Sequence, residues 1–217
     1  MRRNFLTPFV FVAAALLAGC TYEQKGPPEQ HLTDWGSSAP SKNAVSVCHA
    51  YGCQKVTRVI LTEKNVADIA KVMRKTKKAD TPYEERRAVA YAISWLEIEV
   101  GKRIGTSVDR PGMDFSASGD PTQQDCVDEA TNTTSYLMFL YGRGLIKKHT
   151  VAIPISKGRI WRGVKNWPHW TAILKENETG QHYAVDSWIY ENGENPAVVK
   201  LEDWYIKDLD NLSRPTT

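Results

Sequence analysis

The sequence predicts an α+β fold, in which helices come first and a meander of antiparallel strands follows. Between residues 64 and 142, apolar side chains recur at three- and four-residue steps, as they do on amphipathic helices. From residue 149 onward the pattern changes to short β-like runs, two of which flank the turn-forming NETG. Helices followed by strands, instead of alternating with them, indicate the α+β class.

The expected elements follow in order from residue 44. Residues 55–61 (KVTRVIL) are rich in β-branched side chains, which predicts a strand. A helix is expected over 64–78. A second helix begins after Thr81, which forms a capping box with Glu84. The buried face of this second helix is expected to contain Ala88, Tyr91, Trp95 and Ile98.

A third helix carries Cys126, after a loop at 110–120. Its apolar and small side chains repeat from Val127 to Tyr141, and Gly142 or Gly144 ends it. The start is open between two caps, Asp120 and Thr122. Both place Cys126 in the first two turns.

The first residues have the pattern of an export signal. Arg2 and Arg3 precede an apolar run of 11 residues, 9–19, which is too short to span a bilayer. The run ends in LAGC, which resembles the bacterial lipoprotein box. We expect residues 1–19 to be a signal peptide and Cys20 to be lipidated. An ordinary signal peptide with an incidental cysteine is the alternative.

This resemblance implies a protein of the bacterial cell envelope that is lipid-anchored and faces the periplasm. Thr21 follows Cys20 in place of the Asp that retains enteric lipoproteins in the inner membrane, so the outer membrane is favoured. Residues 20–43 are polar and rich in Pro, Gly and Ser, which predicts a flexible tether. Residues 44–217 would form one globular domain. Trp35, in the tether, has no assigned role, and its docking on the domain is an open alternative.

Net charge argues against a nucleic-acid partner. The chain carries 28 basic and 25 acidic side chains. Loss of Arg2 and Arg3 leaves 28 − 2 = 26 basic side chains and a net charge of +1. A near-neutral exported protein lacks the excess of positive charge that binding to a polyanion such as nucleic acid requires.

Three cysteines remain beyond Cys20. Cys48 and Cys53 lie close together, and nearby cysteines of exported proteins usually pair, so we expect a disulfide. A metal site that uses Cys48, His49 and Cys53 is the alternative. Cys126 is left as an odd thiol.

The last predicted hairpin brings a histidine and an aspartate together. If its loop is 177–180, paired residues sum to 357, so Thr171 faces Asp186 and His169 is the diagonal neighbour of Asp186 on the same face. A one-residue slip would move Asp186 to the other face. Taken singly, Cys126, His169 and Asp186 are each more often structural residues. Together they supply what a cysteine nucleophile needs: a helix start, a base and a group that orients the base.

These motifs, DCVDEATNTTSYLMFLY, WPHWTAIL and HYAVDSW, resemble the transglutaminase-like branch of the papain-type cysteine enzymes. They are similar in particular to bacterial transglutaminase-like cysteine proteinases of the periplasm, over about residues 80–205. The resemblance implies a papain-like fold with Cys126 as nucleophile, His169 as base and Asp186 as orienter.

The resemblance also bears on the oxyanion and calcium. It implies an oxyanion hole made by the Cys126 N–H and one side chain, for which Gln124 is the candidate, with Gln123 beside it. Some relatives bind calcium through carboxylates that flank the cysteine. Asp125 is present here, but Val127 replaces the second acid. We therefore expect no cofactor, with calcium as the alternative.

The functional prediction is an envelope-anchored thiol hydrolase, foremost a cysteine protease that acts as a monomer on proteins or peptides. A peptidoglycan-stem amidase, a protein-crosslinking acyltransferase and a catalytically silent partner-binding lipoprotein are the alternatives. Trp161, Trp167 and Trp170 interleave with basic residues around His169 and predict a substrate rim. A solvated loop with its tryptophans packed on the core is the alternative.

Overall fold

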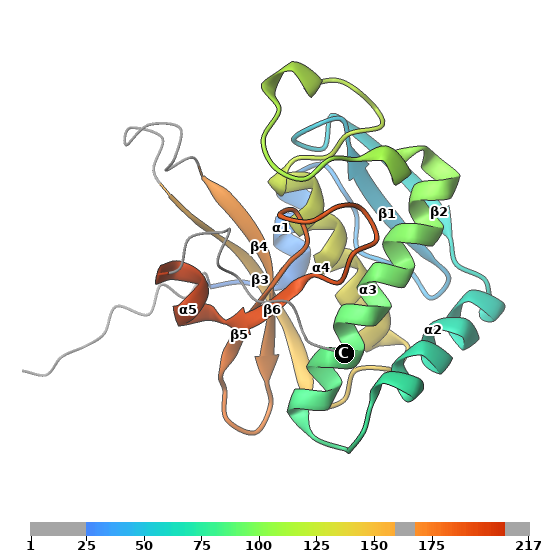
Figure 1. The fold of residues 1–217 in the computed structure, drawn as a ribbon, viewed down its shortest axis with the longest axis vertical. Coiled ribbons are helices and arrows are strands. Elements are labelled where there is room, and N and C mark those ends of the chain that lie inside the picture. Colours follow the sequence, from blue (N-terminus) through green and yellow to red (C-terminus); the bar gives the residue numbers. More distant parts are fainter. Residues whose placement is uncertain (1–24, 159–167, 207–217) are drawn as a thin grey trace, which may run out of the picture.

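The computed structural model describes residues 25–158 and 168–206 of the 217-residue chain. In this part the α+β prediction is confirmed, since five α-helices pack with two antiparallel sheets (Figure 1). No helix within these ranges has the length and apolar character needed to cross a membrane. The predicted signal peptide (1–19) and the predicted lipidation at Cys20 lie outside the described residues.

The elements predicted from the sequence lie close to their expected positions, whereas the helices at 28–34 and 201–206 and the strands at 44–49 and 197–200 were not predicted. The helices are α1 (Pro28–Asp34), α2 (Glu63–Thr76), α3 (Pro82–Ile104), α4 (Cys126–Gly142) and α5 (Leu201–Ile206). The smaller sheet pairs β1 (Ala44–His49) with β2 (Lys55–Ile60). The larger sheet has the order β3 (His149–Lys157), β4 (His169–Glu176), β5 (His182–Asp186) and β6 (Ala197–Lys200). The order along the chain is therefore also the order across this sheet.

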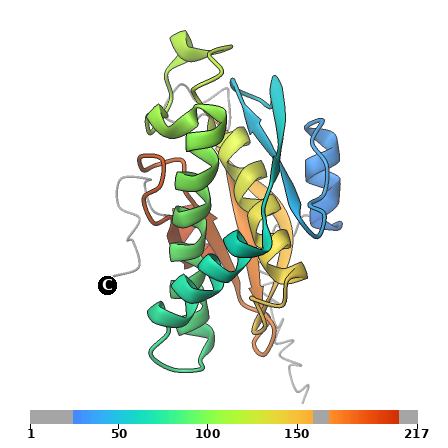
Figure 2. The same cartoon turned by 90° about the vertical axis from the view of Figure 1, so that its right-hand side faces the viewer.

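Helix α4 forms the centre of the fold. It packs on β4 and β3 of the larger sheet, on β1 of the smaller sheet and on α3. Figure 2 shows α4 (yellow) between α3 and the larger sheet (orange). Leu137 and Leu140 of α4 are fully buried, and each such burial contributes about 1.5–3 kcal/mol. Both sheets thereby fix the position of the first turn of α4.

Helix α3 confirms its predicted start but differs in its buried face. The Thr81 hydroxyl accepts the Glu84 N–H, as expected for the cap. Glu84 does not complete a capping box, because its carboxylate instead accepts the Lys78 N–H. Ala88 is fully buried, whereas Ile98 is 40% exposed and lies outside the core.

Residues 28–43 correct the prediction of a flexible tether that extends to residue 43. Helix α1 packs on β3 and α4, with Leu32 fully buried. Nε2 of His31 lies 3.0 Å from the Thr131 hydroxyl of α4. The Trp35 ring lies 6.3 Å from the Trp170 ring, edge-on. The polar composition of the segment gave no sign that Leu32 and His31 anchor it, whereas docking of Trp35 was an open alternative. The domain begins before residue 44.

A buried polar network joins α3 to the start of β3. The Glu85 carboxylate accepts the N–H groups of Lys147 (3.0 Å) and Lys148 (2.7 Å) and lies 3.0 Å from Nδ1 of His149. Arg86 lies 3.1 Å from Nε2 of the same imidazole. Burial alone would raise the pKa of Glu85, but the hydrogen bonds from His149, Lys148 and Lys147 outweigh it and lower the pKa to about 2. The ionised carboxylate is therefore part of the folded structure.

Candidate active site

Cys126 is the first residue of α4. The cap is Asp125, whose carboxylate accepts the N–H groups of Val127 and Asp128, both at 3.0 Å. Asp128 reciprocates by accepting the Asp125 N–H at 3.2 Å, which completes a capping box. The predicted caps Asp120 and Thr122 are wrong. The Asp120 carboxylate accepts the N–H and hydroxyl of Thr122 in the turn that precedes the helix.

His169 and Asp186 meet as the hairpin register predicts. The β4–β5 pairs, from Ala172 with Val185 to Lys175 with His182, all sum to 357. His169 is the first residue of β4 and Asp186 the last of β5. Nε2 of His169 lies 2.6 Å from Oδ2 of Asp186, and both side chains are nearly fully buried.

The Cys126 thiol lies against the head of β4. Its Sγ donates to the carbonyl oxygen of Pro168 at 3.6 Å and is within reach of the Trp170 N–H. These two groups flank His169 in the chain. Nδ1 of His169 is buried and has no hydrogen-bond partner among the described residues. The ring nitrogen that does not face Asp186 thus has no partner in the described part of the chain, on a residue whose two neighbours contact the thiol.

The thiol is neutral in this closed arrangement. Burial raises the pKa of Cys126 to about 12, against the effect of the Trp170 N–H, and the charges of Asp125 and Asp186 raise it further. The helix start alone therefore does not produce a thiolate, contrary to the simple expectation from the helix dipole. Ionisation requires either that a base takes the proton or that the site opens to water.

Two tryptophans enclose the histidine. The Trp188 ring lies 4.7 Å from the His169 ring and the Trp204 ring 5.7 Å from it, each tilted by about 35°. Nε1 of Trp204 also donates to Oδ2 of Asp186 at 2.7 Å. The sequence did not single out either tryptophan for the site. Trp188 could have been found from the sequence, because it follows Asp186 by two residues in the HYAVDSW motif. Trp204 could not have been, because it lies 18 residues from Asp186.

Gln124 does not fit the predicted oxyanion role. Its side-chain Nε2 donates to the carbonyl oxygen of Cys48 at 3.1 Å, which ties β1 to the start of α4. The neighbouring Gln123 donates to the carbonyl oxygen of Val108 at 3.0 Å. Both side-chain amides donate to backbone carbonyls of other segments, so neither is directed to Cys126.

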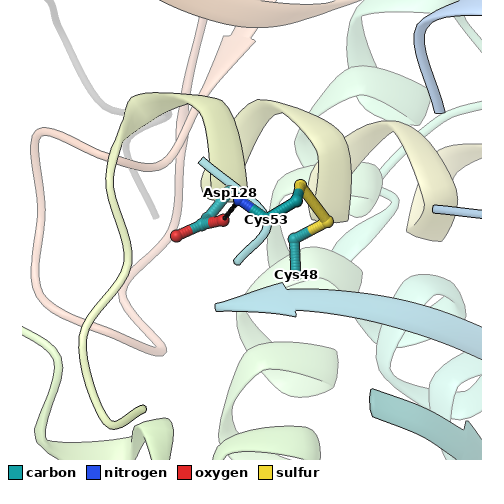
Figure 3. Close-up of side chains that lie close together, drawn as sticks. All are labelled: Cys48, Cys53 and Asp128. Carbon is teal, nitrogen blue, oxygen red and sulfur yellow. Dashed lines mark hydrogen bonds between the residues drawn. A yellow bond between two sulfur atoms is a disulfide. The ribbon is translucent and has the colours of Figure 1, made fainter. Parts of the chain in front are cut away.

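The predicted disulfide between Cys48 and Cys53 is confirmed, with an S–S distance of 2.17 Å. Residues 50–53 all have positive φ angles. The Asp128 carboxylate accepts the N–H group of Tyr51 from this left-handed turn. It also accepts the N–H group of Cys53, as Figure 3 shows. The disulfide loop is thereby fixed to the first turn of α4, next to Cys126.

The alternative metal site is wrong, because its ligands have other partners. Both sulfur atoms are used in the disulfide. His49 lies within hydrogen-bond distance of the Pro121 carbonyl and the Thr57 hydroxyl. Cys48, Cys53 and Asp128 form the one group of three metal-binding side chains found within the described ranges, and this group contains the disulfide.

Trp170 is not on the predicted substrate rim. Successive strand residues point to opposite faces, so Trp170 faces away from the side that carries His169. Its ring lies 5.1 Å from the ring of His31, and α1 covers it. Trp161 and Trp167, the other predicted rim residues, lie outside the described part of the chain.

Buried carboxyl groups gather behind the first turns of α4. Glu97 and Glu129 border a cavity of about 10 Å³, which is room for about one water molecule. The Glu129 carboxylate accepts the Ser187 hydroxyl at 2.7 Å, and the Glu97 carboxylate accepts the Gly193 N–H at 3.0 Å. Burial raises the pKa of Glu129 to about 7, and burial next to Glu129 raises the pKa of Glu97 as well. These acids anchor the segment that follows Asp186.

The raised pKa of Glu129 predicts that stability falls as pH rises. The folded chain binds more protons than the unfolded chain between pH 4.5 and about 7, so the free energy of unfolding declines through this window. Glu129→Gln removes this charge and keeps the shape. We expect the variant to be more stable than wild type by about 1–3 kcal/mol at pH 8 and to differ little at pH 5. Urea unfolding at both pH values tests this, with the exposed Glu191→Gln as control. Equal pH slopes for wild type and Glu129→Gln would contradict it.

The arrangement of Cys126, His169 and Asp186 is the chemically most distinctive feature among the described residues. It joins a helix start, a buried imidazole with one free nitrogen and a carboxylate on the other nitrogen. Comparisons of this chain with models of protein families, with curated proteins and with solved structures found no match.

Proposed function

We propose that this chain is a thiol hydrolase of transglutaminase-like, papain-like fold, with Cys126 as nucleophile, His169 as base and Asp186 as orienter. One observation carries the proposal. His169 contacts Asp186 at 2.6 Å, and Nδ1 of its buried imidazole has no partner among the described residues. The two neighbours of His169 in the chain contact the Cys126 thiol. A nucleophile, a base and an orienter in this order are the minimum set for covalent acyl transfer.

The proposed reaction has two steps. In the first, Sγ of Cys126 attacks an amide carbonyl and Nδ1 of His169 takes the thiol proton. The imidazolium then gives this proton to the leaving amine as the C–N bond breaks, and a thioester remains. In the second, His169 takes a proton from water, the resulting hydroxide attacks the thioester, and the C–S bond breaks with return of the proton to sulfur. Asp186 stabilises the imidazolium in both steps.

The oxyanion donor that remains is the backbone N–H of Cys126. The cap carboxylate of Asp125 takes the next two N–H groups, those of Val127 and Asp128. The Cys126 N–H interacts with its own Sγ, so this donor lies near the carbonyl group that Sγ would attack. A backbone donor of this kind needs no reorganisation when charge develops.

A protease of the cell envelope is the function we favour, with amine transfer and peptidoglycan-stem cleavage as variants of the same chemistry. The catalytically silent, partner-binding lipoprotein is the second candidate. The observation that favours it is the thiol itself, which is 2% exposed and has its pKa raised to about 12. The two candidates differ in whether His169 acts on Cys126.

The first experiment measures alkylation of Cys126 by iodoacetamide against pH, in residues 21–217, which keep every described contact. Cys126 is the free cysteine of the described residues, and Cys126→Ala controls for labelling elsewhere. We expect wild type to react at pH 7 at least about 10-fold faster than His169→Ala, because general bases contribute about 10²–10⁴-fold. Both chains should react equally in urea. Equally slow reaction of both folded chains would identify Cys126 as packing and favour the binding protein.

A second assay separates the acyl acceptors. A quenched fluorescent peptide library reports hydrolysis, and incorporation of a fluorescent amine into a test protein reports transfer. Released stem peptides from purified sacculi report the amidase. We expect the peptide library to give the largest Cys126-dependent signal. If only amine incorporation depends on Cys126, the protein is an acyltransferase and not a protease. If only release of stem peptides depends on Cys126, it is an amidase.

A further inference from the structure

Trp204 is fully buried, although the helix that carries it is short and otherwise partly exposed. Helix α5 has six residues. Trp204 is fully buried in it, whereas Tyr205 and Ile206 are 37% and 82% exposed. Lys157 of β3 lies over the Trp204 ring, 4.4 Å from its centroid, and donates to the Trp204 carbonyl oxygen. This side chain is therefore the anchor of the helix, and Lys157 holds it from the strand that pairs with β4.

The Trp204 indole is hydrogen-bonded to the proposed triad. Its Nε1 donates to Oδ2 of Asp186 at 2.7 Å, and the same oxygen contacts Nε2 of His169 at 2.6 Å. Oδ1 of Asp186 is buried without a partner in the described part of the chain. One carboxylate oxygen therefore carries both contacts, and the position of that oxygen depends on both.

The chemistry of indole makes this contact directional. An indole N–H donates and never accepts. An oxygen that accepts it is favoured in the ionised form, because hydrogen bonds to a carboxylate stabilise that form. An ionised Oδ2 in turn favours the tautomer in which His169 donates through Nε2. That tautomer leaves Nδ1 as the acceptor, which is the state a base for Cys126 requires.

We propose that Trp204 is a positioning residue, which keeps Oδ2 of Asp186 an acceptor and thereby holds His169 in the tautomer whose Nδ1 is free. The inference rests on the proposed function. It goes further in one respect: α5, packed on β5 and β6, completes the site through the N–H group of Trp204. The role is distinct from packing, because it depends on the nitrogen of the indole and not on its bulk.

The test is Trp204→Phe, which keeps an aromatic ring and removes the N–H. The control is Trp95→Phe, at a partly buried tryptophan of α3 that packs on the core outside the site. Iodoacetamide alkylation of Cys126 in residues 21–217 is followed from pH 5 to 9, with thermal melting of each variant. We expect Trp204→Phe to lower the rate at pH 7 by about 10-fold, at the lower end of the contribution of a hydrogen bond to a charged group. The pH profile should change shape. Trp95→Phe should retain the wild-type profile even if its melting temperature falls.

Three results are distinguishable. Wild-type alkylation that does not depend on His169 defeats the proposed function itself. Alkylation that depends on His169 but keeps its rate and pH profile in Trp204→Phe defeats only the role of Trp204, whatever happens to the melting temperature. If Trp204→Phe does not fold, the indole N–H resonance of Trp204 in the wild-type chain decides. Its proton shift should follow the pH midpoint of the alkylation profile, and a shift independent of pH overturns the proposal.

Discussion

Replacing Asp186 with alanine should slow acylation of Cys126 by p-nitrophenyl acetate by about 10²–10⁴-fold. The physical reason is the burial of His169, which is 3% exposed. When His169 takes the thiol proton, the imidazolium has Asp186 as its hydrogen-bonded counterion. Without that carboxylate the charge forms in a buried site without compensation, which costs about 3–5 kcal/mol. The initial release of p-nitrophenolate measures the acylation step.

The asparagine variant separates charge from geometry. Asp186→Asn keeps an oxygen that can accept from Nε2 of His169 and removes the negative charge. We expect its loss to be smaller, about 10-fold. Melting temperatures of both variants should be recorded, since Asp186 also accepts the Trp204 N–H. A folded Asp186→Ala chain that acylates at the wild-type rate would remove Asp186 from the mechanism.

Replacing Glu85 with alanine should lower the free energy of unfolding by about 3–5 kcal/mol, the largest effect on stability that we expect. The change removes the acceptor of two backbone N–H groups, those of Lys147 and Lys148, and the partner of the buried His149 imidazole. Unfolding in urea at pH 7 measures the loss. Glu63→Ala is the matched control, because Glu63 also forms an ion pair, with Arg143, but its side chain is 72% exposed. The control should change stability by less than about 1 kcal/mol.

The pH dependence of this effect has a definite sign. The folded-state pKa of Glu85 is lowered to about 2. Its contribution is therefore fully present above the unfolded pKa and is lost as pH falls from about 4.5 to about 2. The difference between wild type and Glu85→Ala should shrink through this window. A difference that stays constant down to pH 2 would mean that shape, and not the ionised carboxylate, accounts for the loss.

The sequence alone determined the parts of the fold that local patterns specify. The helical period placed Cys126 near the start of α4. The NETG turn set the register of β4 and β5, and the register brought His169 beside Asp186. The spacing of Cys48 and Cys53 predicted their disulfide. In each case the relevant partners are near in sequence or are related by a turn of fixed length, so the pattern contains the geometry.

The tertiary structure decided what depends on distant partners. Helix α1 folds against β3 and α4, although the composition of its segment is that of a linker. Gln124 donates to the Cys48 carbonyl, and Trp170 packs under α1, so neither has the role that its position near Cys126 or His169 suggested. Trp204 reaches Asp186 from α5, and β6 lies between Asp186 and this helix in the chain. Burial also determines the state of the Cys126 thiol, because exclusion of water raises its pKa more than the backbone N–H groups of Trp170 and Cys126 lower it. Spacing along a chain does not report exclusion of water, which the packing of distant segments creates.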